Sequence, residues 1–339
     1  MNRKGIAVAG NMIVDILYRV QGLPGPGELT TILEGFSRSS GGALCNVIAD
    51  LAKLDAALPL TALGRLGKDA EGDYVLSLLK EHANIDTSKI IRGGITSFTS
   101  VMGDAITNQR SFFHYRGANA VFSESDINWD SLTADFLHIG YILLLDSLDA
   151  EDAEFGTKMA RLLCHAKEQG IKTSVDVVSE NGTRFKTIVP PALKYTDYCV
   201  INEFEAERTT GVRLRDGKDG LISSNMREAL GKLGDFGVST WTVIHSSEAG
   251  FGLDSKGSYV EIPNLDLPPG YIKGTVGAGD AYCSGVIYGA YRGLSLKESL
   301  ELGTAAAACS LSEPGATEGM RSAEDAMALY RSFRSGSGV

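Results

Sequence analysis

From about residue 130 onward, short apolar segments alternate with longer segments. The apolar segments at 136–140, 172–176, 198–202 and 241–244 are typical of buried strands. The long segment between the first two predicts a helix over 149–169. Strands that alternate with helices form a parallel sheet with right-handed crossovers, so the sequence predicts an α/β fold with helices on both faces of a mostly parallel central sheet.

Three polar residues stand at the carboxyl ends of these strands, namely Asp176, Asn202 and His245. Ligands of such sheets bind outside the carboxyl ends of the strands. We therefore expect these three side chains to gather at one binding site.

The N-terminal part of the chain follows a different pattern. Residues 6–9 predict one more buried strand. Four β-rich segments with no helix directly after them predict a small antiparallel sheet beside the main one; they are 16–20, 29–36, 97–102 and 110–115.

The length of 339 residues suits one large domain, or one large and one small. We expect a single domain over 1–334, with the small sheet formed by inserted segments at about 16–38 and 96–117. The Ser- and Gly-rich residues 335–339 predict a flexible tail.

Composition argues against several functional classes. The formal net charge of −10 disfavours nucleic-acid or anionic-membrane partners. No run of about 18 apolar residues predicts a membrane span, and the N-terminus lacks the apolar length of a signal peptide. The five cysteines show no CxxC spacing and predict buried free thiols in a reducing cytoplasm.

A glycine-rich turn at 274–280 precedes a helical segment. Such a turn directs free backbone N–H groups and the positive end of the helix dipole at one point, which suits a phosphate. Asp280 lies at that point, where a carboxylate can take a proton from an attacking hydroxyl. It is equally well explained as a helix N-cap. The following Gly285, Gly289 and Gly293 share one helical face and predict close packing.

This turn resembles the Asp-Thr-x-Gly-Ala-Gly-Asp signature of the ribokinase-like (PfkB) carbohydrate kinases, with Gly274 in place of the first Asp. The resemblance implies that Asp280 is the catalytic base and that the amides of Gly277, Ala278 and Gly279 form an anion hole. Thr275 and Gly279 would then contact the nucleotide. Family members often bind K⁺ with help from the first Asp, so we expect weak or absent K⁺ activation here.

A second motif carries the resemblance further. Gly41, Gly42 and Asn46 match the family's Gly-Gly-x-x-x-Asn, which implies that the glycines let a sugar approach the backbone while the Asn binds a sugar hydroxyl. Asp15 and Arg116 are implied as further substrate-binding residues. The alternative for Asn46 is a solvated side chain in a helix. The alternative for Arg116 is ordinary strand packing. The family also has a small β lid over the sugar, which often makes a dimer contact.

The third motif follows the strand at 198–202. Asn202 and Glu205 match the family's Asn-x-x-Glu, which implies that they organise Mg²⁺, largely through water, and the phosphates of ATP. A helix capping box is the alternative. His245 and Gly250 occupy the place of the family's nucleotide loop, although His245 and Ser247 stand where Thr and Gly are usual.

Together these motifs predict an ATP-dependent kinase that phosphorylates a primary hydroxyl of a sugar or sugar-like polyol. We expect a homodimer through the lid. The sequence has no Walker A motif, which argues against a P-loop kinase. It also has no Gly-x-Gly-x-x-Gly after the first strand, which argues against a standard NAD-binding domain. The alternatives are a nucleoside kinase of the same fold, with Phe112 or Tyr115 stacking on a base, and a non-catalytic sugar-binding protein.

Overall fold

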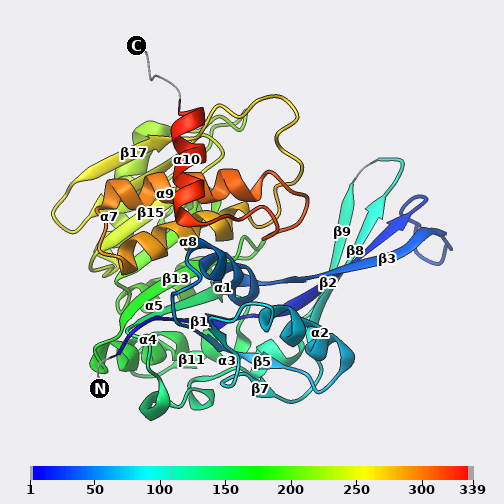
Figure 1. The fold of residues 1–339 in the computed structure, drawn as a ribbon, viewed down its shortest axis with the longest axis horizontal. Helices are drawn as coiled ribbons and strands as arrows, with labels where there is room; N and C mark the ends of the chain where they lie inside the picture. Colours follow the sequence, from blue (N-terminus) through cyan, green and yellow to red (C-terminus); the bar gives the residue numbers. More distant parts are fainter. Residues whose placement is uncertain (1–2, 108, 335–339) are drawn as a thin grey trace.

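A computed structural model describes residues 3–107 and 109–334. The central element is a nine-stranded sheet in the order β17-β16-β15-β14-β13-β10-β1-β4-β6 (Figure 1). Its strands are β1 (Ile6–Gly10), β4 (Leu60–Leu63), β6 (Ile85–Asp86), β10 (Phe136–Ile142), β13 (Lys172–Val177), β14 (Tyr198–Asn202), β15 (Trp241–His245), β16 (Ala249–Asp254) and β17 (Tyr259–Pro263). All pairings are parallel except those of β16 with its two neighbours.

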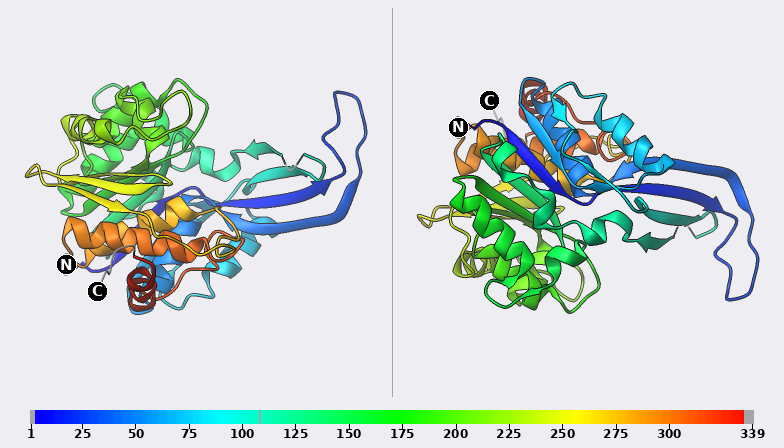
Figure 2. Two further views of the ribbon diagram at one scale, coloured as in Figure 1. Left: turned by 90° about the horizontal axis from the view of Figure 1, so that it is seen from above. Right: turned by 90° about the horizontal axis from the view of Figure 1, so that it is seen from below.

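Helices cover both faces of this sheet, as predicted (Figure 2). One buried core includes residues of α1 (Ala43–Leu54), α2 (Ala70–Leu79), α8 (Ala278–Tyr291), α9 (Leu296–Ser310) and α10 (Ala323–Phe333). The other includes residues of α4 (Lys158–Glu168), α5 (Phe185–Leu193), α6 (Glu203–Thr210) and α7 (Met226–Asp235). Along β1, Ile6 and Val8 join the first core while Ala7 and Ala9 join the second, because successive strand residues face opposite sides.

The helix predicted over 149–169 is wrong in its first half. The chain there forms a short α3 (Asp146–Asp149), a two-stranded hairpin of β11 (Glu151–Asp152) and β12 (Gly156–Thr157), and only then α4. The Asp152 carboxylate accepts the backbone N–H groups of Glu154 and Phe155, an arrangement that favours a turn over a helix.

The small sheet, which we call the lid, projects from one side of the main body (Figure 1). It consists of β2 (Ile13–Val20), β3 (Ile32–Gly41), β8 (Ser97–Asp104) and β9 (Arg110–Tyr115), in the order β3-β2-β8-β9. The two outer pairings are antiparallel, as predicted, but the central pairing of β2 with β8 is parallel. The long β3 ends at Gly41, so the lid leads directly into α1.

The close helix packing predicted from three glycines is confirmed for two of them. A Cβ on Gly285 would lie 2.7 Å from the Cα of Gly303, and one on Gly289 would clash with the Ser299 side chain, so α8 rests against α9 at van der Waals distance. Gly293 lies beyond the end of α8 and has a positive φ of 74°.

All five cysteines are free, as predicted, but only four are buried. Cys164, on α4, is partly exposed, and its Sγ lies 3.8 Å from the carboxylate of the exposed Glu168. Among the described residues, no helix has the length and apolar character needed to cross a membrane.

Candidate active site

The glycine-rich turn places Asp280 in the first turn of α8. Gly277 is the N-cap of this helix, with φ of 77° and no side chain to cap it, so the N-cap interpretation of Asp280 is wrong. A Cβ on Gly277 would lie 2.6 Å from the carbonyl oxygen of Ala316, which explains why glycine is required there. The first N–H groups of α8 therefore have no side-chain acceptor, which suits an incoming anion.

Two side chains from other elements hold the Asp280 carboxylate. The Asn46 amide on α1 donates a 2.8 Å hydrogen bond to Oδ2, and the Tyr141 hydroxyl on β10 donates a 2.6 Å hydrogen bond to Oδ1. Burial raises the pKa of Asp280, and these two hydrogen bonds act against that rise. Asn46 is buried, so the solvated alternative is wrong. Sequence reasoning missed Tyr141, although its place near the end of a buried strand was a usable signal.

A cavity of about 240 Å³ lies beside Asp280 at the carboxyl edge of the sheet. We call it the sheet-edge cavity. Asp176, Asn202 and His245 all line it, as the strand-end argument predicts. Its other lining residues are Tyr141, Val177, Val178, Ser179, Glu205, Gly277, Gly279 and Asp280.

Asn202 and Glu205 form the capping box at the start of α6. The Asn202 side chain accepts the Glu205 N–H, and Glu205 Oε2 accepts the Asn202 N–H at 3.0 Å. Ser179 also donates a 2.7 Å hydrogen bond to Glu205. Burial raises the pKa of Glu205 to about 7. Asn202 and Glu205 therefore cap α6 and line the cavity at the same time.

The edge of the His245 ring packs against the first turn of α8 at Gly279. A Cβ on Gly279 would lie 3.2 Å from His245 Cε1, and the His245 and Tyr282 rings are 5.0 Å apart. Burial lowers the pKa of His245 to about 4, so the ring is neutral at physiological pH. Gly250 and Thr275 do not line the cavity; Gly250 instead leaves space for the Tyr282 hydroxyl.

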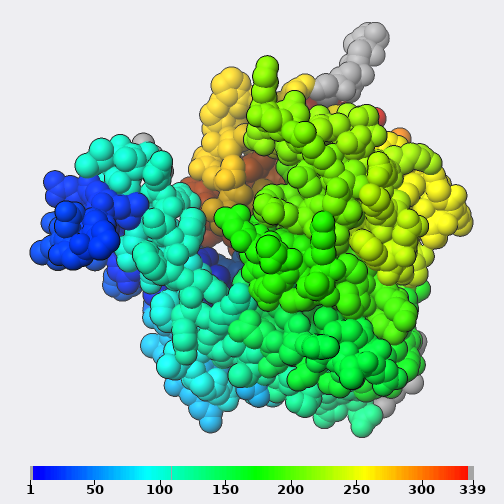
Figure 3. Space-filling view, turned by 180° about the vertical axis from the view of Figure 1, so that it is seen from behind, coloured from blue at the N-terminus to red at the C-terminus, as the bar shows by residue number. Residues whose placement is uncertain are grey.

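A second cavity of about 310 Å³ lies under the lid; we call it the lid cavity. The space-filling view shows the hollow between the lid and the main body (Figure 3). Its lining residues are Asp15, Leu17, Ser39, Ser40, Gly41, Asn46, Val101, Arg110, Phe112, Val276, Pro314, Gly315 and Ala316. Asn46 lines this cavity and bonds Asp280, which lines the other, so the two cavities meet at this pair.

The predicted substrate residues divide into two groups. Asp15, Gly41 and Asn46 line the lid cavity, and Gly42 precedes α1 with a φ of 90°, its backbone close to Asn11. Arg116 lines neither cavity: its guanidinium donates to the Leu143 carbonyl at 2.9 Å and pairs with Asp146 at 3.1 Å.

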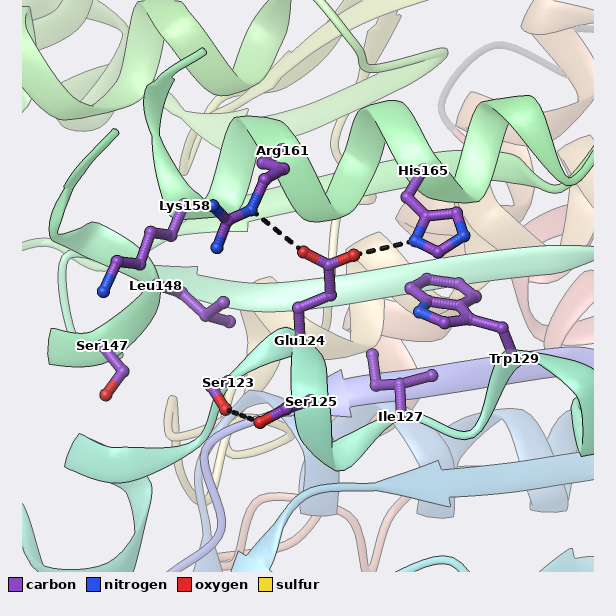
Figure 4. A pocket seen from close by; sticks show the side chains of 10 residues that line it. All are labelled: Ser123, Glu124, Ser125, Ile127, Trp129, Ser147, Leu148, Lys158, Arg161 and His165. Atoms are coloured by element: carbon purple, nitrogen blue, oxygen red, sulfur yellow. Dashed lines mark hydrogen bonds and ion pairs between the residues drawn. The ribbon is translucent and has the colours of Figure 1, made fainter. Parts of the chain in front are cut away.

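A third cavity, of about 500 Å³, lies between α4 and residues 123–129 (Figure 4). Its centre is the Glu124 carboxylate, which accepts hydrogen bonds from Arg161 at 3.2 Å and from His165 at 2.8 Å. Its charged groups largely satisfy one another, and none of the predicted site residues lines it. The candidate site therefore lies at the sheet-edge and lid cavities.

Comparison with known proteins decides the family. The pattern of the pfkB family carbohydrate kinases matches residues 3–323. The chain belongs to this family. It is an ATP-dependent carbohydrate kinase, and the resemblance seen in its motifs is confirmed.

Two carbohydrate kinases and one solved structure illustrate the similarity. The 5-dehydro-2-deoxygluconokinase of Clostridium perfringens is 24% identical over 309 residues, which cover 85% of this chain and 83% of that protein. The ribokinase of Lactococcus lactis is 24% identical over 322 residues, 93% of each chain. The structure of Arabidopsis thaliana ribokinase with ribose and ATP has a TM-score of 0.78 at 21% identity and covers 97% of this chain and 99% of its own.

Proposed function

We propose that this kinase transfers the terminal phosphoryl group of ATP to a primary hydroxyl of a sugar or sugar-like polyol, with Asp280 as the base. One observation carries the proposal: Asp280, in the first turn of a helix whose N-terminus has no side-chain cap, lines the sheet-edge cavity and accepts a hydrogen bond from Asn46, which lines the lid cavity. A hydroxyl and a phosphate can thus approach the same carboxylate from opposite sides.

The lid cavity is the proposed sugar site. Asp15, Asn46 and the backbone at Gly41 and Gly42 would hold substrate hydroxyls. One hydroxyl would face Asp280, which takes its proton as the oxygen bonds to phosphorus and the bond from phosphorus to the ADP oxygen breaks. The amides of Gly277, Ala278 and Gly279 would stabilise the charge on the transferring group.

The sheet-edge cavity is the proposed site for the phosphates and their metal ion. Its oxygen donors, Asn202 and Glu205, suit Mg²⁺, which retains several of its waters and needs few protein carboxylates. Bound there, Mg²⁺ would neutralise phosphate charge. Glu205 would hold its hydration shell, and neutral His245 would pack beside the anion hole without adding charge. Gly250 and Thr275 line neither cavity, so neither has a contact with the nucleotide in this proposal.

The lid would exclude water from the reacting groups and so limit wasteful ATP hydrolysis. Its apolar side chains support a homodimer formed through the lid, since exposed apolar patches mark interaction surfaces. The free thiols support a reducing cytoplasm as its location.

The test is ADP release with Mg²⁺–ATP across ribose, fructose, 2-keto-3-deoxygluconate, 5-dehydro-2-deoxygluconate, inositol and nucleosides. Turnover on a sugar or polyol supports the proposal and supplies the substrate. Phe112 lines the lid cavity whereas Tyr115 does not, so stacking by Phe112 would account for turnover confined to nucleosides. That result would replace the proposal by the nucleoside kinase alternative.

A further inference from the structure

The proposed phosphoryl transfer gives no role to Tyr141. Its hydroxyl reaches Asp280 Oδ1 from the sheet-edge cavity, while Asn46 reaches Oδ2 from the lid cavity. The carboxylate is thereby held at both oxygens by donors from two different elements. Because Asn46 is on the sugar side, Oδ2 is the oxygen nearer the substrate hydroxyl, and Oδ1 is committed to Tyr141.

The phenol is suited to be a permanent donor. Burial, together with the neighbouring Asp280 carboxylate, raises the pKa of Tyr141 well above its usual value, so the hydroxyl keeps its proton. A donor to an ionised carboxylate stabilises the ionised form. A short hydrogen bond also restricts the carboxylate to one orientation, which matters when a base must face one hydroxyl.

The other titratable groups around Asp280 give it no such support. They come from each element packed around it: Asp50 on α1, Asp176 on β13, Glu205 on α6, His245 on β15 and Cys283 on α8. The Asp280 charge acts to raise the pKa of each of the three carboxyl groups, so none of them offers it a positive partner, and His245 is neutral. Hydrogen bonds rather than a cation from this set must therefore keep the base ionised.

We propose that Tyr141 is a positioning residue for the base: its hydroxyl fixes the Asp280 carboxylate from the nucleotide side and keeps it charged, so that Oδ2 can accept the substrate proton. This inference rests on the proposed role of Asp280. It assigns to Tyr141 no contact with the sugar.

The direct test follows the Asp280 carboxyl by carbon-13 NMR in protein labelled at aspartate, with Asp280→Asn to identify its resonance. In Tyr141→Phe we expect the titration midpoint to rise by about one pH unit, because the ionised form loses one hydrogen bond. Tyr288→Phe is the matched control: Tyr288 lies in α8 and donates a 3.1 Å hydrogen bond to another aspartate, Asp55. An unchanged midpoint in Tyr141→Phe, or an equal rise in Tyr288→Phe, would overturn the inference.

Kinetics provide the second readout once a substrate is known. We expect the acid limb of kcat/KM in Tyr141→Phe to move up by about one unit, with turnover about tenfold lower on that limb and KM for the sugar nearly unchanged. A merely structural role would lower activity equally at all pH values. Near-normal turnover in Asp280→Asn would instead defeat the proposed function, while the NMR result would still report on the hydrogen bond.

Discussion

At the scale of single residues, the strongest claim concerns Asp280. Asp280→Asn keeps the size of the side chain and its bond to Tyr141, but the amide cannot take up a proton. We expect kcat to fall by about 10²- to 10⁴-fold, with the unfolding midpoint little changed. Exposed Asp235 at the end of α7 offers the control, since Asp235→Asn leaves the site untouched. Steady-state ADP release checks both, and normal turnover in Asp280→Asn would remove the base assignment.

A second prediction at this scale concerns Gly274, which stands where the family signature has Asp. A Cβ there would lie 2.6 Å from the Pro314 carbonyl oxygen, so the backbone leaves no space for a carboxylate side chain. Replacing Na⁺ by K⁺ at constant ionic strength should therefore leave kcat within about twofold, because an ion that does not bind shifts no equilibrium. A clear rate increase with K⁺ would contradict this prediction.

At the scale of elements, the contact of α8 with α9 fixes the helix that carries Asp280. Gly285→Ala should lower the free energy of unfolding by about 1–3 kcal/mol, because the new methyl group meets the α9 backbone at Gly303. The matched change Gly231→Ala, in α7, meets no atom within 4 Å and should raise it by up to about 1 kcal/mol. Urea denaturation measures both. Equal effects in the two variants would show that helix propensity, rather than packing, governs these sites.

At the scale of the whole molecule, the two faces of the lid differ in their surroundings. Leu17, Val101 and Phe112 face the lid cavity. The strand register puts Phe36 and Phe113 on the opposite face, where they are 64% and 62% exposed. If this face forms the dimer, Phe36→Glu or Phe113→Glu should yield monomers in light scattering. Val121→Glu, an exposed apolar site off the lid, should not.

The sequence by itself determined the features that depend on local pattern. Alternating apolar and helical segments predicted the parallel sheet and its two helical layers, and the glycine-rich turn located Asp280. Because ligands of parallel sheets bind at the carboxyl ends of the strands, the sequence also predicted that Asp176, Asn202 and His245 share one site. Each of these features follows from the spacing of residues that are near one another in the chain.

Only the tertiary structure decided which distant groups meet. Tyr141 and Asn46 lie 139 and 234 residues from Asp280, and their contacts depend on how β10, α1 and α8 pack. The same packing directs Arg116 to Asp146, away from both cavities. The structure also shows a turn at Asp152 where the sequence predicted a helix from residue 149. Periodicity reports which face of an element is buried, whereas these contacts depend on which element that face meets.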